Sequence, residues 1–123
     1  MNKESELITE DMHKIANNYS KNATLYLKNF RYADALDNYK NALEIQEIVK
    51  SAPITIANTR EKMGIVYIYR HKYEDALTNF IKALKIYKSQ LGTTDTYTTN
   101  VYLHIGMAYE NLMDKQKEIE HDC

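Results

Sequence analysis

The chain has 123 residues, a size that suits one domain, and carries 16 Lys and Arg against 17 Asp and Glu for a net charge of -1. Charges of both signs are mixed along it, so we expect neither a nucleic-acid partner nor a membrane-surface partner. No apolar run reaches the ~18 residues of a membrane span, and Cys123 is the only cysteine, which favours a reducing, cytoplasmic location. With only 3 Gly and 1 Pro, an all-α chain fits better than a sheet protein rich in tight turns.

Apolar residues recur at helical spacing in several segments, and a few residues mark where helices should begin and end. Ser51 is expected to cap a helix whose first turn contains Pro53. Gly92 is expected to end a helix, after which a cap for the next should come from residues 93–95. The predicted helices cover residues 9–29, 32–50, 53–70, 73–90 and 95–112.

The sequence repeats itself with a period of 41 to 42 residues. An Ala-x3-aromatic-x2-Ala pattern begins at Ala35 and again at Ala76. A second pattern, with a small residue in third place, occurs three times, as Tyr19, Asn22, Ala23 and Tyr26, as Arg60, Met63, Gly64 and Tyr67, and as Tyr102, Ile105, Gly106 and Tyr109. The small residues are predicted where two helices of a hairpin approach closely.

This pair of patterns resembles the tetratricopeptide repeat. The resemblance implies an all-α, right-handed solenoid of antiparallel helix hairpins, with a concave side lined by the first helix of each repeat. The usual repeat has about 34 residues, and the longer period here resembles the repeats of kinesin light chains. We divide the single domain into repeat one at 9–50, repeat two at 51–92 and an incomplete repeat three at 93–123.

Repeat three departs from the pattern after its first helix. Glu118 and Asp122 stand where repetition predicts an alanine and an aromatic residue. Residues 115–123 therefore fit a polar terminal cap, a frayed tail or the cut end of a longer array, and we favour the cut end. Without a second helix, Tyr102, Ile105 and Tyr109 should be uncovered, which predicts a homodimer through the C-terminal repeat.

The expected binding surface is the concave side, where a protein or peptide partner would lie. Three asparagines recur there in phase and could hydrogen-bond an extended peptide backbone while facing solvent, although local hydrogen bonding is the simpler interpretation. A clamp for a C-terminal carboxylate is not recognisable, and the mixture of apolar and basic residues suggests a peptide with apolar anchors and some acidic character. The candidate peptide-binding residues are Asn17, Lys21, Asn58, Lys62, Ile65, Tyr69, Asn100, Leu103, His104 and Met107.

We find no pattern that indicates catalysis, a cofactor or a metal site. The four histidines are too far apart in sequence to form ligand pairs on one helix. The segment 121–123 holds three potential ligands, but an exposed chain end is a poor metal cage. The sequence therefore predicts a non-catalytic scaffold or adaptor that binds proteins, with a kinesin-light-chain-like cargo adaptor as its specific version. The alternatives are a self-association module and a regulatory domain of a longer enzyme.

Overall fold

The computed structural model describes residues 3–122, which form five α-helices and, within that range, no β-strand. Each helix packs mainly against its neighbours in the chain, most extensively within the first two hairpins. The helices are α1 (Lys3–Lys28), α2 (Tyr32–Ile48), α3 (Pro53–Tyr69), α4 (Tyr73–Leu91) and α5 (Thr96–Asp122).

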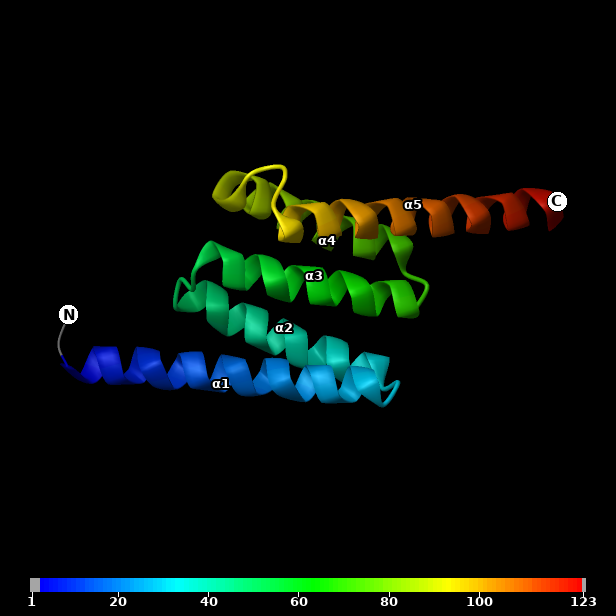
Figure 1. Ribbon diagram of the computed structural model, residues 1–123. Helices are drawn as coiled ribbons and strands as arrows, with labels where there is room; N and C mark the ends of the chain where they lie inside the picture. Colours follow the sequence, from blue (N-terminus) through cyan, green and yellow to red (C-terminus); the bar gives the residue numbers. More distant parts are fainter. Residues whose placement is uncertain (1–2, 123) are drawn as a thin grey trace.

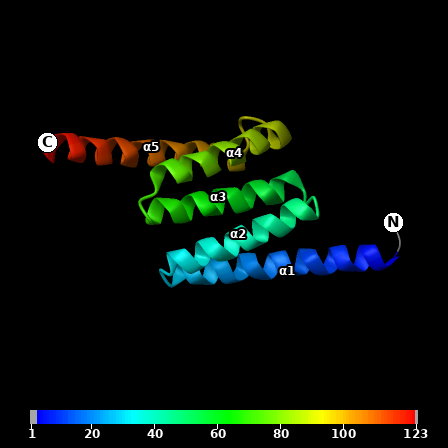
Figure 2. The same cartoon turned by 180° about the vertical axis from the view of Figure 1, so that it is seen from behind.

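The helices are stacked in chain order, with α1 along one edge and α5 along the other (Figures 1 and 2). The N-terminal part of α1 and the C-terminal part of α5 extend past their neighbours at opposite ends of the stack. Short turns make α1 and α2, and likewise α3 and α4, antiparallel hairpins. The predicted all-α solenoid of helix hairpins is confirmed.

The ends of α1, α2 and α3 share one geometry. The residues that follow, Phe30, Lys50 and His71, have φ angles of 61°, 54° and 61°. This left-handed conformation turns the chain and lets a backbone N–H reach a carbonyl in the last helical turn, as Arg31 does toward Tyr26 over 2.9 Å. None of the three is glycine, so each of these turns carries some backbone strain.

The predicted helix signals are confirmed at three positions and wrong at one. Gly92, with φ 87°, ends α4, and the Asp95 carboxylate accepts a hydrogen bond of 2.9 Å from the first turn of α5. Pro53 lies in the first turn of α3, as expected. Ser51 does not cap this helix. The N-cap is Ala52, which has no side-chain cap bond, so Ser51 lies one residue too early to reach the first helical N–H groups.

The two outer helices are longer than predicted. Helix α1 begins at Lys3 rather than near Thr9, and α5 continues to Asp122 rather than ending near 112. Half of the added residues are Lys, Glu or Gln, which favour helix without needing a buried face. Residues 115–122 are the last turns of α5 and do not fold back as a second helix, while Cys123 lies outside the described residues.

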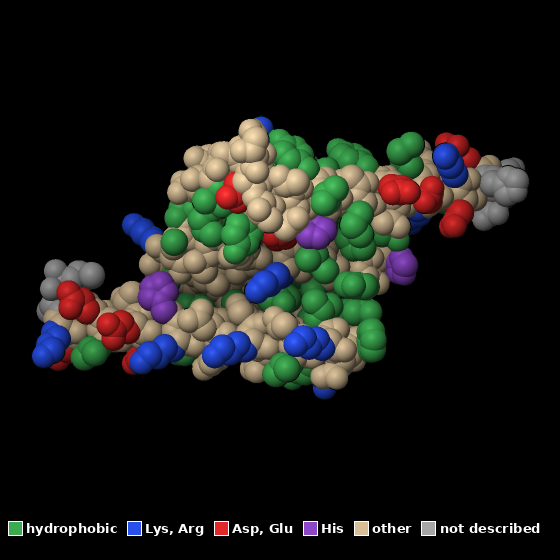
Figure 3. Space-filling view, in the orientation of Figure 1, with side chains coloured by type: hydrophobic (Ala, Val, Ile, Leu, Met, Phe, Trp, Pro, Cys, Tyr) green, Lys and Arg blue, Asp and Glu red, His purple; other side chains and the backbone are tan. Residues whose placement is uncertain are grey.

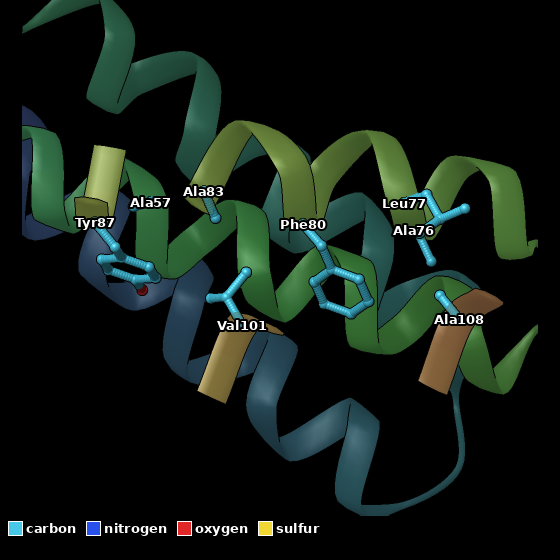
Figure 4. Close-up of a cluster of buried hydrophobic side chains, with 8 residues drawn as sticks. All are labelled: Ala57, Ala76, Leu77, Phe80, Ala83, Tyr87, Val101 and Ala108. Atoms are coloured by element: carbon cyan, nitrogen blue, oxygen red, sulfur yellow. The ribbon is translucent and has the colours of Figure 1, made fainter. Parts of the chain in front are cut away.

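Two buried clusters hold the stack together. One joins Ala23 of α1 and Tyr39 of α2 to Met63 and Val66 of α3. The other is built around α4, whose Phe80 and Tyr87 rings point into the space shared with α3 and α5 (Figure 4). The members of this second cluster are Ala57, Ala76, Leu77, Phe80, Ala83, Tyr87, Val101 and Ala108. Neighbouring repeats are thus joined by continuous apolar packing.

The predicted close approach occurs at one of the two glycines. A Cβ on Gly64 would lie 2.5 Å from Cε1 of Phe80, so only glycine fits against this ring. At Gly106 the prediction is wrong, because a Cβ there would meet nothing within 4 Å. The described chain has no second helix in repeat three to approach it.

Part of the apolar surface of repeat three is exposed. Tyr102 and Tyr109 are 45 % and 50 % exposed, as predicted. Ile105 was also expected to be uncovered, but it is partly buried and packs against the cluster around α4. It lies on the side of α5 that faces the preceding repeat, not on the side that a second helix would cover.

Candidate functional site

The first helices α1, α3 and α5 form one face of the molecule, which we call the first-helix face. A cavity of about 390 Å³ opens on this face between α1 and α3. It is lined by Ser20, Lys21, Thr24 and Leu25 of α1 and by Lys62 of α3. Figure 3 shows Lys and Arg side chains spaced along α1 beside this region.

Neither lysine of this cavity has an acidic residue three or four positions away on its own helix. The residues three and four positions from Lys21 and from Lys62 are all uncharged. Both lysine side chains are exposed. The α1/α3 cavity therefore combines two lysines with the apolar surface of Leu25, which is 56 % exposed.

A second cavity, of about 310 Å³, lies between α3 and α5 on the same face. Most of its lining side chains are apolar or aromatic, and the imidazole of His104 also lines it. The Tyr69 ring stacks on Tyr32 of α2 with centroids 5.3 Å apart, which fixes one wall. The lining residues are Ile65, Ile68, Tyr69, Phe80, His104 and Met107.

A polar network ties the three helices of this region together. The Tyr87 hydroxyl of α4 donates to Asn58 and lies 3.1 Å from the Glu61 carboxylate, both on α3. The other oxygen of Glu61 is 2.9 Å from Nδ1 of His104 on α5. The His104 ring also stacks on Phe80, with centroids 5.2 Å apart. Glu61 thus connects repeats two and three.

Burial of Tyr87 has an electrostatic consequence. Its side chain is fully buried, and desolvation together with the nearby Glu61 carboxylate raises the pKa of the Tyr87 phenol well above its ordinary value. The hydroxyl is therefore held as a neutral hydrogen-bond donor. Tyr39 on α2 is also buried, and burial raises the pKa of its phenol too.

The three asparagines in phase differ in their surroundings. Asn17 and Asn100 are exposed on α1 and α5. Asn58 was expected to face solvent freely, and this is wrong. It is partly buried and accepts the hydrogen bond of Tyr87, so its amide already has a structural partner. The three therefore do not form one uniform row of free amides.

All but one of the other candidate residues line one of the two cavities. Lys21 and Lys62 line the α1/α3 cavity. Ile65, Tyr69, His104 and Met107 line the α3/α5 cavity. Leu103 is 63 % exposed on α5 and lines neither cavity.

Sequence reasoning missed two groups of this site. Leu25 was not singled out, although it follows Lys21 by four residues and so shares its face of α1. Tyr87 was also missed. It lies four residues after Ala83 of the second-helix pattern and so continues the buried stripe of α4. This four-residue spacing is the sequence signal from which burial of Tyr87 could have been predicted.

Within the described part of the chain, no three His, Cys, Asp or Glu side chains are grouped so that they could hold a metal ion. The side chains of 121–123 lie outside this description. Among residues 3–122, no helix is both long enough and apolar enough to cross a membrane. The first-helix face therefore has two cavities, one lined by two lysines and the other mainly by apolar and aromatic side chains.

Comparison with known proteins identifies the class. The tetratricopeptide repeat family matches residues 54–121, more than half of the chain, and covers α3, α4 and most of α5. The chain belongs to the tetratricopeptide repeat family. No curated protein matches the chain. Tetratricopeptide repeats commonly mediate protein-protein interaction and are typically non-catalytic.

Proposed function

We propose that this protein binds a peptide segment of a partner protein along the first-helix face. The observation that carries the proposal is the presence of two adjacent cavities on that face, separated only by α3. Two lysines line one cavity, and mainly apolar and aromatic side chains together with His104 line the other. A segment lying across α3 would contact both.

The chemistry of the cavities indicates what the segment contains. The lining of one cavity includes Lys21 and Lys62 and no carboxylate, so an acidic side chain placed there would meet two positive charges. Ile65, Tyr69 and Met107 line the other, which suits an apolar or aromatic anchor. We therefore expect a peptide with an acidic residue and an apolar residue on the two sides of α3.

Selection from a displayed library of short peptides, followed by fluorescence anisotropy, tests this function. Lys62→Glu should weaken binding of the selected peptides by at least about tenfold, or about 1.4 kcal/mol. Lys82→Glu is the matched control, because Lys82 is also exposed but lies on α4, away from the first-helix face. Peptides that lose affinity with Lys82→Glu and not with Lys62→Glu would place the binding site elsewhere.

The specific role of cargo adaptor similar to kinesin light chains stays a prediction from the repeat length. The cytoplasmic location also stays a prediction. The alternative of a self-association module is favoured by a different observation, the exposed aromatic residues of α5. Self-association would involve this surface of α5 and not the first-helix face.

A further inference from the structure

One side of α5 has no covering helix within the described chain, and we call it the α5 outer face. It consists of Tyr102, Gly106, Tyr109 and Met113, whose three large side chains are 45 %, 50 % and 59 % exposed. In the repeat register Tyr102, Gly106 and Tyr109 follow Arg60, Gly64 and Tyr67 of α3 by 42 residues, whereas Met113 follows His71, which lies beyond the end of α3. The α4 helix covers that side of α3.

Repeat two shows what chemistry covers such a face. Gly64 accepts the ring of Phe80 from the antiparallel α4, and no room for a Cβ remains. Gly106 occupies the same register position but lies open in the middle of a long helix, where glycine weakens helix formation without gaining a contact. A large ring seated on Gly106 would give this glycine the function that Gly64 has.

The α5 outer face is complementary to itself. Its members are separated by four, three and four residues, so the spacing reads the same in both directions. In an antiparallel pair of α5 helices, Gly106 can therefore face the partner's Tyr109, and Tyr102 can face the partner's Met113. Each Gly106 then contacts a Tyr109 ring, and the two-fold symmetry of the pair produces both contacts twice.

Charge favours the antiparallel arrangement. From Thr96 to Tyr109 the helix contains no Asp, Glu, Lys or Arg, whereas the charged residues of α5 all follow from Glu110 onward. An antiparallel pair places the charged turns of each copy opposite uncharged turns of the other. A parallel pair would place each charged residue opposite its own kind.

We propose that the α5 outer face binds a second copy of this chain, in an antiparallel α5 pair about a two-fold axis, with the Tyr109 ring of each copy seated on Gly106 of the other. This contact is independent of the proposed peptide site, because neither cavity of the first-helix face includes a residue of the α5 outer face. Peptide binding and pairing can therefore fail separately.

Sedimentation equilibrium of the full chain in reducing buffer tests the pairing. The unaltered chain should form dimers at tens of micromolar, and Gly106→Gln should raise the dimer dissociation constant by at least about tenfold. In the monomer the new side chain enters open space, so the thermal midpoint of a dilute sample should stay equal or rise. Ile81→Gln, on the exposed side of α4, is the control and should leave pairing unchanged.

Cross-linking tests the antiparallel register in a Cys123→Ser background. Chains with Tyr102→Cys mixed with chains with Met113→Cys should be joined by a short bifunctional maleimide, whereas neither variant alone should be. A monomer at high micromolar concentration would overturn the proposal. So would a dimer that tolerates both Gly106→Gln and Tyr109→Gln, or cross-linking of Tyr102→Cys chains to one another, which indicates parallel pairing.

Discussion

The ring of Phe80 occupies the space that a side chain on Gly64 would need, with Cε1 2.5 Å from the Cβ position. The ring is fully buried in the cluster around α4 and is stacked on His104, so it cannot move aside without disturbing α5. This contact fixes how closely the two helices of repeat two approach each other.

Gly64→Leu should lower the free energy of unfolding by about 1–3 kcal/mol or more, because the added side chain overpacks the hairpin. Thermal and urea denaturation followed by circular dichroism measure the change. Gly106→Ala is the matched control and should raise stability by up to about 1 kcal/mol in dilute samples, since its Cβ meets no other atom. An unchanged midpoint for Gly64→Leu would contradict the packing described for repeat two.

Lys50→Gly should raise the free energy of unfolding by about 0.5–1 kcal/mol. Lys50 has φ 54°, a conformation that costs a residue with a Cβ and costs glycine little. Lys40→Gly, at an exposed site inside α2, should instead lower stability by about 1 kcal/mol. If urea denaturation finds both variants destabilised to the same extent, the strain assigned to the turn after α2 is not real.

A double-mutant cycle should reveal the buried hydrogen bond between repeats one and two. The Thr59 hydroxyl donates to Oε1 of Gln46 over 2.8 Å, and both side chains are almost fully buried. Thr59→Val should cost about 1–3 kcal/mol, because it leaves a buried amide oxygen without its donor. Adding Gln46→Leu should recover part of this loss. Additive losses in the two single variants would show that the bond contributes nothing specific.

Stability should fall in alkaline solution, and Tyr87 should contribute to the fall. Its pKa is raised in the folded state, so its contribution is fully present below the unfolded-state pKa of about 10 and is lost as pH rises above that value. Tyr87→Phe should flatten the decline of unfolding free energy above about pH 10. A slope equal to that of the unaltered chain would contradict the assignment.

The repeat architecture could be read from the sequence because close helix packing demands particular side-chain sizes. Ala23, Ala35 and Ala76 are all fully buried, as their repeat phase required. The length of α5 could not be read in this way. Its last turns contain good helix formers but no repeat pattern, so periodicity gave no reason to extend it.

The site was less predictable from the sequence. The position of a residue within the repeat shows which face of its helix it occupies, but not which side chain from another helix will contact it. Asn58 shares its phase with Asn17 and Asn100, yet it is the one that lies within reach of Tyr87, 29 residues later. Gly106 matches Gly64 in sequence, but its environment depends on a helix that the described chain does not supply. The placement of Lys21 and Lys62 at one cavity agrees with their expected face.

Helix α3 belongs to both buried clusters, since Ala57 packs in the one around α4 while Met63 and Val66 pack with α1 and α2. Opening α3 would therefore expose both cores at once, whereas fraying of α1 or α5 would expose only one. Repeats one and two should unfold as a single cooperative unit, not one after the other. The amides in the middle of α3 should be the last in the chain to exchange with solvent deuterium.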